Sequence, residues 1–193
     1  TFKKLMNQKV SKKKLNRLLK KIYKLEWLLN KIQSVRGTKD IFPAEMQKYN
    51  IIINKAKFIS ELYGFEEAAF PIIEKSDVFT RPLGESSDVV SKETYTFADR
   101  GDDRITLRPE GTAGIMRSVL SQGKLNELPI KLFYSGPMFR YERPQKGRLR
   151  QFIQIGIESI GSSNAIEDVE VIQCGVSFLN KLGILKSCVL NIN

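Results

Sequence analysis

The alternation of side chains over residues 148–158 constrains the fold more than any other feature of the sequence. Odd positions are mostly apolar, whereas the even positions carry Arg148, Arg150, Phe152, Gln154, Gly156 and Glu158. Because successive side chains of a β-strand point to opposite faces, the odd positions predict a core face and the even positions a polar face. At ~3.3 Å per residue the polar face is about 33 Å long. It suits an elongated ligand, anionic at one end and cationic or hydrogen-bonding at the other. The alternative is a solvated sheet face with assorted charges.

A second strand-like run, residues 130–142, precedes the first and is joined to it by the polar loop 143–147. If paired residue numbers sum to 290, the pairs are Arg140 with Arg150, Glu142 with Arg148, and Met138 with Phe152. Two facing arginines repel each other unless an anion lies between them. A nucleotide triphosphate would supply the anion, since a planar guanidinium binds phosphate oxygens at two points. Phe152 could then stack on the base.

A carboxylate and a hydroxyl stand at a predicted strand-to-helix junction, at Glu110 and Thr112. Such a junction can hold both groups rigidly, in a position to receive an ammonium group. A helix-capping role is the alternative for Thr112.

Hydrophobic periodicity and turn residues predict the other elements. In chain order they are a helix over 43–62 that ends at Gly64, a strand over 65–71, a hairpin over 94–108 with its turn at 100–103, a helix from 112, a helix over 164–181 and a final strand over 187–192. The predicted fold class is α+β, an antiparallel sheet flanked by helices, with 130–142 and 148–160 adjacent and central.

The formal net charge of +11 is concentrated near the N-terminus. Residues 1–35 hold 11 Lys or Arg and one acid, against 21 and 20 in the remainder. Leu15, Leu18, Ile22, Leu25, Leu29 and Ile32 recur at helical spacing and predict a basic helix with a narrow apolar seam. Packing on the body or on a partner, contact with an RNA backbone, and an organellar targeting remnant are the three interpretations. Residues 1–34 are predicted to be a helical extension, and residues 35–193 one domain.

The composition excludes several kinds of site. The chain has no His, and its two cysteines, Cys174 and Cys188, are far apart, so an imidazole base, a Ser-His-Asp triad and a zinc centre are not expected. Both thiols are predicted to be reduced and buried. No apolar run approaches the roughly 20 residues that span a bilayer, so we expect no membrane association. The first residue is Thr, and we expect a cut or processed piece.

Two motifs resemble those of a known family: LRPEGTA at 107–113 and GPMFRYERPQKGRLRQF at 136–152. They are similar to the histidine-site and motif 2 signatures of histidyl-tRNA synthetases, which are class II aminoacyl-tRNA synthetases. Residues 43–71 resemble motif 1, the dimer-interface element, and residues 84–97 also fit. The resemblance covers roughly 35–193. The family's second histidine signature, its motif 3 and its anticodon-binding domain have no counterpart in the chain.

The resemblance implies a role for individual residues. Arg140 would contact the ATP α-phosphate and the adenylate; Glu142, Arg148 and Arg150 would surround the nucleotide; Phe152 would lie under adenine; Glu110, Gly111, Thr112, Gln154 and Arg140 would bind histidine; Glu158 would read the imidazole. Loop 143–147 would approach the tRNA acceptor stem. The implied partners are ATP with Mg²⁺, histidine, tRNA(His) and a second copy of the chain. The implied compartment is the cytoplasm, with a mitochondrion or plastid as the alternative.

The implied reaction is attack of the histidine carboxylate on the ATP α-phosphorus, followed by acyl transfer to the terminal ribose of tRNA. Positioning and charge neutralisation would supply most of the catalysis. With family segments missing, the piece alone is expected to be impaired. A synthetase-like regulatory paralogue and a plain tRNA-binding or dimerising module are the competing functions. The arginines and Glu110 argue against a regulator, which has no need of an adenylate site.

Overall fold

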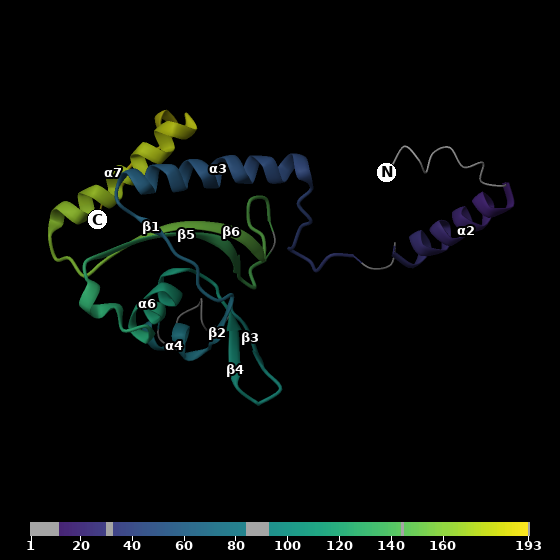
Figure 1. Ribbon diagram of the computed structural model, residues 1–193, viewed down its shortest axis with the longest axis horizontal. Coiled ribbons are helices and arrows are strands. Elements are labelled where there is room, and N and C mark those ends of the chain that lie inside the picture. The colour runs from purple at the N-terminus through teal and green to yellow at the C-terminus, as the bar shows by residue number, and fades with distance from the viewer. Residues whose placement is uncertain (1–11, 30–32, 84–92, 144, 193) are drawn as a thin grey trace. The chain divides into compact units, whose positions relative to one another are not determined.

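A computed structural model describes residues 12–29, 33–83, 93–143 and 145–192 (Figure 1). The chain divides into two compact units, Thr1–Val35 and Arg36–Asn193. None of the described helices is long and apolar enough to cross a membrane.

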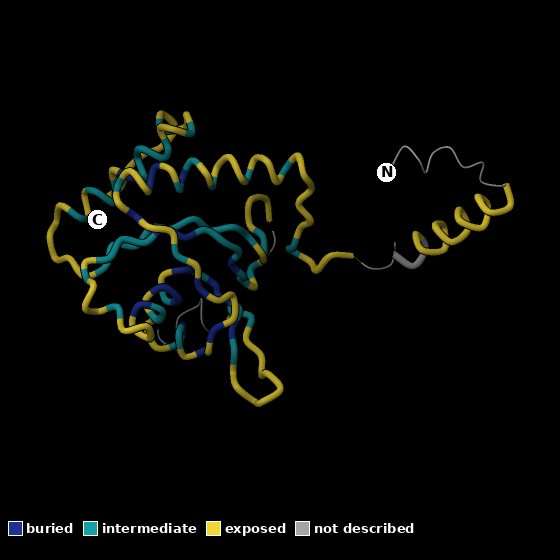
Figure 2. The backbone as a smooth tube through the Cα atoms, in the orientation of Figure 1, coloured by how far each residue is buried: buried dark blue, intermediate teal, exposed yellow. Residues whose placement is uncertain are grey.

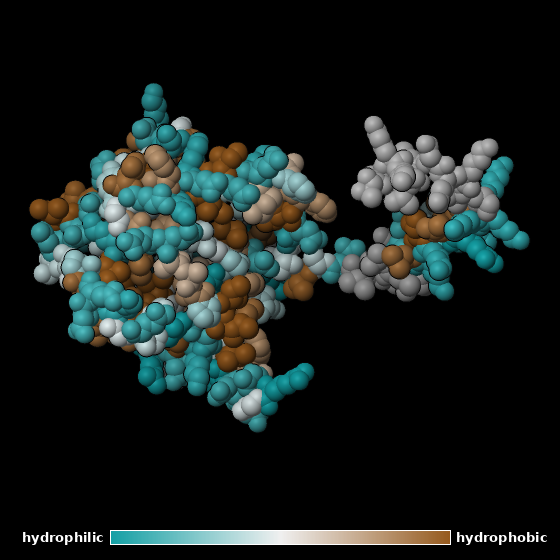
Figure 3. Space-filling model, viewed as in Figure 1, coloured by the Kyte–Doolittle hydropathy of each residue, from teal (hydrophilic) through white to brown (hydrophobic). Residues whose placement is uncertain are grey.

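The first unit contains helix α2 (Lys12–Leu29), which confirms the predicted helix over these residues. Residues 1–11 and 30–32 of that prediction lie outside the described part of the chain. Hydrophobic residues gather on one side of α2 and hydrophilic residues on the other (Figure 3). The seam residues Leu15, Leu18, Ile22 and Leu25 are all exposed. The helix therefore presents an apolar stripe beside its lysines.

The main sheet of the second unit has the strand order β1-β5-β6, formed by β1 (Glu66–Glu67), β5 (Ile130–Phe139) and β6 (Gln151–Ile160). Strands β5 and β6 are antiparallel, and every pair between Ile130 with Ile160 and Phe139 with Gln151 follows the predicted register. Strand β1 is parallel to β5 and shorter than the predicted strand 65–71. The sheet is therefore mixed. Among the described residues its two edge strands are β1 and β6, so the prediction that 130–142 and 148–160 are adjacent is confirmed, and the prediction that 148–160 is central is wrong.

A second sheet has the order β2-β4-β3, formed by β2 (Ile73–Lys75), β4 (Arg104–Leu107) and β3 (Tyr95–Ala98). Both of its pairings are antiparallel, which confirms the predicted hairpin. The hairpin delivers Arg108 and Pro109 to α6 (Thr112–Ser121), and α4 (Asp77–Leu83) follows β2.

The two faces of the main sheet pack against different helices, as Figures 1 and 2 show. Helices α3 (Pro43–Leu62) and α7 (Ala165–Leu182) cover the odd face, where Phe133, Ile155 and Ile157 join Ala56, Ile59 and Cys174. Helix α6 covers the even face, where Tyr134, Met138 and Phe152 pack with Phe70, Ile115 and Val119. The parity predicted for β6 is confirmed, and its even face is not a fully solvated surface.

The predicted helices 43–62 and 164–181 are confirmed by α3 and α7. Pro43 lies in the first turn of α3, and Gly64 just beyond its end adopts φ +78°. Asn164 caps α7 by accepting a hydrogen bond of 3.0 Å from the Ile166 backbone N–H. Both ends follow the residue preferences that mark helix termini.

Three further predictions about the body were wrong. Residues 187–192 do not form a strand: a 3₁₀ turn, Leu185–Ser187, leads into extended chain, because no described strand lies beside this apolar run. Strand β5 ends at Phe139 rather than at 142, and strand β6 begins at Gln151 rather than at 148. Their terminal backbone groups bind elsewhere, since Tyr141 N donates to Glu93 O and Arg150 N to Gly37 O, each over 2.7 Å. Cys174 is buried as expected, but Cys188 is exposed.

Candidate active site

One end of the polar face of β6 holds a hydrogen-bonded group around the Glu158 carboxylate. The Thr112 hydroxyl donates to Glu158 Oε1 over 2.8 Å, and the Tyr134 hydroxyl donates to the same oxygen over 3.4 Å. Gln154 Nε2 donates to the Tyr134 hydroxyl over 3.1 Å. Side chains that the resemblance implied at histidine therefore converge here, from β6 and from the first turn of α6.

Glu110 lies at the start of α6 and caps that helix. Its carboxylate accepts hydrogen bonds of 2.6 Å from Thr112 N and 2.9 Å from Ala113 N, two backbone donors that have no partner within the helix. The capping alternative for Thr112 is wrong, because the capping oxygens belong to Glu110 and the Thr112 hydroxyl turns to Glu158. The positive end of α6 stabilises the Glu110 charge and fixes its position.

Tyr134 is central to this group, and the sequence analysis missed it. Its side chain is 2% exposed, and its ring passes between two glycines. A Cβ atom at Gly111 would lie 2.1 Å from Tyr134 Cζ, and one at Gly156 would lie 2.3 Å from the same atom. Gly156 is also the residue paired with Tyr134 across β5 and β6. A glycine opposite a tyrosine inside a strand pair marks a close approach, and this signal was available in the sequence.

The electrostatics of the group favour a cation. Burial raises the pKa of Glu158 above its usual range, and the charge of Glu110 adds to the rise, although hydrogen bonds from Thr112 and Tyr134 oppose it. Burial, with the charges of Glu158 and Glu110, raises the pKa of Tyr134 to about 12, so its hydroxyl stays protonated at neutral pH. Among the described ion pairs, none involves Glu110 or Glu158. An ammonium or imidazolium group would stabilise both carboxylates.

The other end of the polar face opens into a cavity of about 550 Å³. Its lining includes Glu93, Arg140, Glu142, Gly147, Arg148, Leu149, Phe152 and Ile153. Arg140 Nε donates to Pro109 O over 2.8 Å, and its guanidinium lies 5.3 Å from the centre of the Phe152 ring. Arg148 Nη1 donates to Glu142 Oε2 over 3.2 Å, so the two residues that were predicted to lie opposite each other are in contact. An aromatic face beside two guanidinium groups suits a base and its phosphates.

Arg150 does not join this cavity lining. Its guanidinium lies 3.9 Å from the centre of the Tyr141 ring, and its Nε donates to Glu142 O over 3.2 Å. Arg140 N still donates to Arg150 O over 2.9 Å, so the two backbones face each other as predicted. Their side chains separate because the regular strands end at Phe139 and Gln151. The expected anion shared by these two arginines is therefore not supported.

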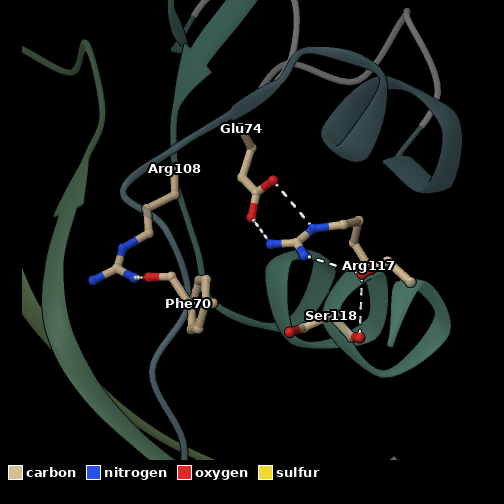
Figure 4. A network of polar contacts seen from close by, with 6 residues as sticks. Phe70, Glu74, Arg108, Arg117 and Ser118 are labelled. Carbon is tan, nitrogen blue, oxygen red and sulfur yellow. Dashed lines mark hydrogen bonds and ion pairs between the residues drawn. The ribbon is translucent and has the colours of Figure 1, made fainter. Parts of the chain in front are cut away.

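A partly buried ion pair holds α6 in place behind the carboxylate end (Figure 4). Glu74 on β2 is 8% exposed and accepts hydrogen bonds from both Nε and Nη2 of Arg117 on α6, the former over 3.2 Å. Two parallel hydrogen bonds fix the orientation as well as the distance of such a pair. Helix α6, whose first turn carries Thr112, is thus tied to the second sheet through Arg117.

The chain is similar in sequence to a known family of proteins. The sequence model of the histidyl-tRNA synthetase family matches residues 37–193. Histidine–tRNA ligase of Rhodospirillum rubrum is 51% identical over 162 residues, which are 84% of this chain and 39% of the relative. That of Rickettsia bellii is 46% identical over 166 residues, which are 86% of this chain and 40% of the relative. The chain spans about two fifths of the length of these curated relatives.

Solved structures give the same result. The apo histidyl-tRNA synthetase of S. aureus matches with a TM-score of 0.66 and 39% identity, covering 79% of this chain and 35% of that one. A Bacillus halodurans protein, described as an ATP phosphoribosyltransferase regulatory subunit/histidyl-tRNA synthetase, matches with a TM-score of 0.68 and 26% identity, covering 79% and 38%. These neighbours confirm the predicted α+β class II fold. The chain belongs to the histidyl-tRNA synthetase family.

Proposed function

We propose that this chain forms the ATP-binding and histidine-binding part of a histidine–tRNA ligase. The observation that carries the proposal is the order of groups along one sheet face. A hydrogen-bonded group with two carboxylates, Glu110 and Glu158, lies at one end, and a cavity with Arg140 and Arg148 lies at the other. Histidine would place its cationic groups at the first end and its carboxylate toward the second.

In the proposed reaction, a histidine carboxylate oxygen attacks the α-phosphorus of ATP, and the bond to pyrophosphate breaks as the new P–O bond forms. A ribose hydroxyl of tRNA(His) then attacks the carbonyl carbon of the adenylate, and AMP leaves. Arg140 would stabilise negative charge at the α-phosphate, and Arg148, paired with Glu142, would contact the outer phosphates. Phe152 would stack under adenine. Arg150 would support the loop through Tyr141 rather than touch the nucleotide.

Mg²⁺ would arrive with ATP. Among the described residues no group of three or more His, Cys, Asp or Glu side chains could hold a metal ion by itself. Mg²⁺ is commonly bound by one or two carboxylates together with phosphate oxygens and water, and Glu142 in the cavity lining fits that role. The ion would neutralise phosphate charge in the nucleotide complex.

If the chain were a synthetase-like regulatory paralogue, the Arg140 end of the sheet face would not bind a nucleotide. The cavity argues for the ligase, because Arg140, Glu142 and Arg148 face one space beside the Phe152 ring. Titrations with ATP and with histidine separate the ligase from the other alternative, a plain tRNA-binding or dimerising module, which would bind neither.

Glu158→Gln is expected to weaken histidine binding by about 10- to 100-fold, because a hydrogen bond to a charged group is worth ~1.5–3 kcal/mol. ATP binding should not change, since Glu158 lies at the opposite end of the face. The free energy of unfolding at neutral pH should rise, because the raised pKa shows that burying this negative charge destabilises the fold. Calorimetric titrations and urea denaturation measure all three effects.

Histidine affinity should also depend on pH. Since burial raises the pKa of Glu158, protonation removes its charge at a higher pH than for an ordinary glutamate, and affinity falls as the pH drops through that value. Glu127→Gln is the matched control, because Glu127 is an exposed acid paired with Lys124 in a 3₁₀ turn. An unchanged histidine affinity in Glu158→Gln would remove this residue from the site.

Removing residues 1–34 is expected to reduce salt-sensitive binding of tRNA, because ten of the eleven net charges leave with them. For every RNA phosphate that is no longer neutralised, the slope of log affinity against log salt should fall by about 0.7–0.9. Lys13→Gln with Lys20→Gln should reproduce part of this change, whereas Leu18→Gln should not. An identical slope after truncation would favour packing as the role of this segment. The cytoplasm remains the proposed compartment, with an organelle as the alternative.

We further propose a symmetric dimer formed through residues 43–71. Several apolar side chains of α3 are exposed, among them Ile51, Phe58 and Leu62. These three side chains lie at helical spacing on one face of α3 and suit a contact surface. In Figure 3 the surface over α3 carries both hydrophobic and hydrophilic residues. Ile51→Glu should convert a dimer of the 22.1 kDa chain into a monomer in light scattering, whereas Ile166→Glu on α7 should not. A wild-type monomer at high micromolar concentration would contradict the dimer.

A further inference from the structure

Arg108, the residue that follows β4, has a buried side chain whose contacts are unusual for a cation. It is 5% exposed. Nε donates to Pro137 O over 2.9 Å, and Nη1 donates to Phe70 O over 2.8 Å. The guanidinium also lies 4.4 Å from the centre of the Phe70 ring (Figure 4). Both acceptors are neutral carbonyl groups, and burial lowers the pKa of Arg108. Burying a cation against neutral groups costs free energy, so the arrangement calls for a reason.

The neighbouring strand is shaped to admit this guanidinium. A Cβ atom at Gly136 would lie 2.4 Å from Arg108 Nη2, so any other residue there would displace the side chain. Gly136 is paired with Gln154, which belongs to the carboxylate end of the site. The Arg108 guanidinium therefore lies against β5, at the residue that is paired with Gln154 of the proposed ligand face.

The backbone of the same residue is held on both sides. Arg108 N donates to Ile72 O over 2.9 Å, and Phe139 N donates to Arg108 O over 3.0 Å. With the two guanidinium bonds, residue 108 is fixed to the chain before β2 and to the end of β5.

The two residues after Arg108 each serve a different end of the site. Pro109 O accepts the 2.8 Å hydrogen bond from Arg140 Nε at the nucleotide end. Glu110 caps α6 and contributes negative charge at the carboxylate end. A shift of this short segment would move Arg140 and Glu110 together.

We infer that Arg108 is a positioning residue for the proposed reaction: its guanidinium locks residues 108–110 onto β5, and the locked segment aims Arg140 at the nucleotide while it holds Glu110 beside Glu158. The effect on ligands rests on the proposed function. The effect on Arg140 does not.

Three variants test the inference. Arg108→Lys keeps the charge but lacks the planar fork that reaches two carbonyls at once. Arg108→Met removes the buried charge and is expected to fold, since an apolar replacement relieves the desolvation cost. Gly136→Ala leaves Arg108 unchanged in sequence but adds a Cβ atom in the space that the Arg108 guanidinium occupies. Arg117→Lys is the matched control, because it disrupts a two-point arginine contact to the buried Glu74 that does not touch residues 108–110.

The first measurement is the Arg140 Nε–H signal in ¹⁵N NMR spectra of the 193-residue chain, assigned by its loss in Arg140→Lys. In the wild type this proton is bonded to Pro109 O, so it should exchange slowly with water. We expect exchange to be at least about tenfold faster in Arg108→Lys, Arg108→Met and Gly136→Ala, because one hydrogen bond is worth ~1.5 kcal/mol. Arg117→Lys should lower stability and leave this signal unchanged.

The second measurement is the affinity of the folded chain for ATP and for histidine. Both affinities should fall by about tenfold or more in the Arg108 variants, because a charged hydrogen bond is worth ~1.5–3 kcal/mol. In Arg117→Lys the affinity for ATP should not fall, because Arg117 contacts neither residues 108–110 nor Arg140. A folded Arg108 variant with an unchanged Arg140 signal would overturn the inference. If the signal responds but the wild type binds neither ligand, the positioning role stands and the proposed function fails.

Discussion

Arg140→Ala is expected to abolish measurable ATP binding by this chain, with a decrease of about 100-fold in affinity from the missing charged contacts. The Nε atom of Arg140 donates to Pro109 O, and Nη1 lies 4.0 Å from Glu142 Oε1. The guanidinium lines the cavity beside the Phe152 ring, where phosphate oxygens would bind. Equilibrium dialysis with labelled ATP measures the decrease. Arg100→Ala, at the exposed turn of the β3–β4 hairpin, is the control and should bind ATP like the wild type.

The same substitution should have a larger effect on catalysis. In a chain extended through the family's missing segments, Arg140→Ala should slow histidine-dependent exchange of pyrophosphate into ATP by about 100- to 1000-fold, the usual cost of removing a preorganised donor. The unextended 193-residue chain should exchange little, because it lacks the second histidine signature and motif 3. Robust exchange by the shorter chain would refute the claim that its site is incomplete. No exchange by the extended wild-type chain would refute the ligase proposal.

Gly156→Ala is expected to lower the free energy of unfolding by about 1–3 kcal/mol, the usual cost of overpacking a core. The new Cβ atom would lie 2.3 Å from Tyr134 Cζ, so the ring must leave the gap between Gly111 and Gly156. Displacement of Tyr134 would also remove its hydrogen bonds to Gln154 and Glu158. Histidine affinity should therefore fall together with stability. Thermal denaturation and histidine titration measure the two effects.

A second glycine separates this steric effect from a general intolerance of substitution. Gly175 lies inside α7, and a Cβ atom there would meet nothing within 4 Å. Gly175→Ala should raise stability by about 0.5–1 kcal/mol, because alanine loses less backbone entropy in a helix. Adding Tyr134→Leu to Gly156→Ala should restore part of the stability but not the histidine affinity. Equal destabilisation at both glycines would contradict the role given to Tyr134.

The features that could be predicted from the sequence are those set by regular secondary structure: the face on which a side chain lies, the strand register and the helix ends. Strict alternation placed Phe152, Gln154 and Glu158 on one face, and the predicted register was right for every pair from Ile130 with Ile160 to Phe139 with Gln151. Helix ends were predictable because Pro43 and Gly64 have strong positional preferences. These features depend on residues that are near in sequence or that face each other in a single antiparallel strand pair.

What the sequence did not predict depends on individual side-chain contacts that periodicity does not specify. Glu110 caps α6 and Arg150 stacks on Tyr141, and neither contact follows from periodicity. Tyr134 has the sequence pattern of an ordinary core residue. Its role follows from contacts with Gly111 before α6 and with Gln154 and Glu158 on β6. The final strand was predicted from apolar content alone, although a strand needs a neighbour to satisfy its backbone groups.

The central claim is that one sheet face holds a single elongated ligand site, with adenylate at the Arg140 end and the histidine side chain at the Glu158 end. A nonhydrolysable histidyl-adenylate analogue, titrated into the 193-residue chain, tests it most directly. We expect the analogue to bind more tightly than either ATP or histidine, to be displaced by both, and to be weakened separately by Arg140→Ala and by Glu158→Gln. An analogue that binds no better than ATP and is unaffected by Glu158→Gln would contradict the claim.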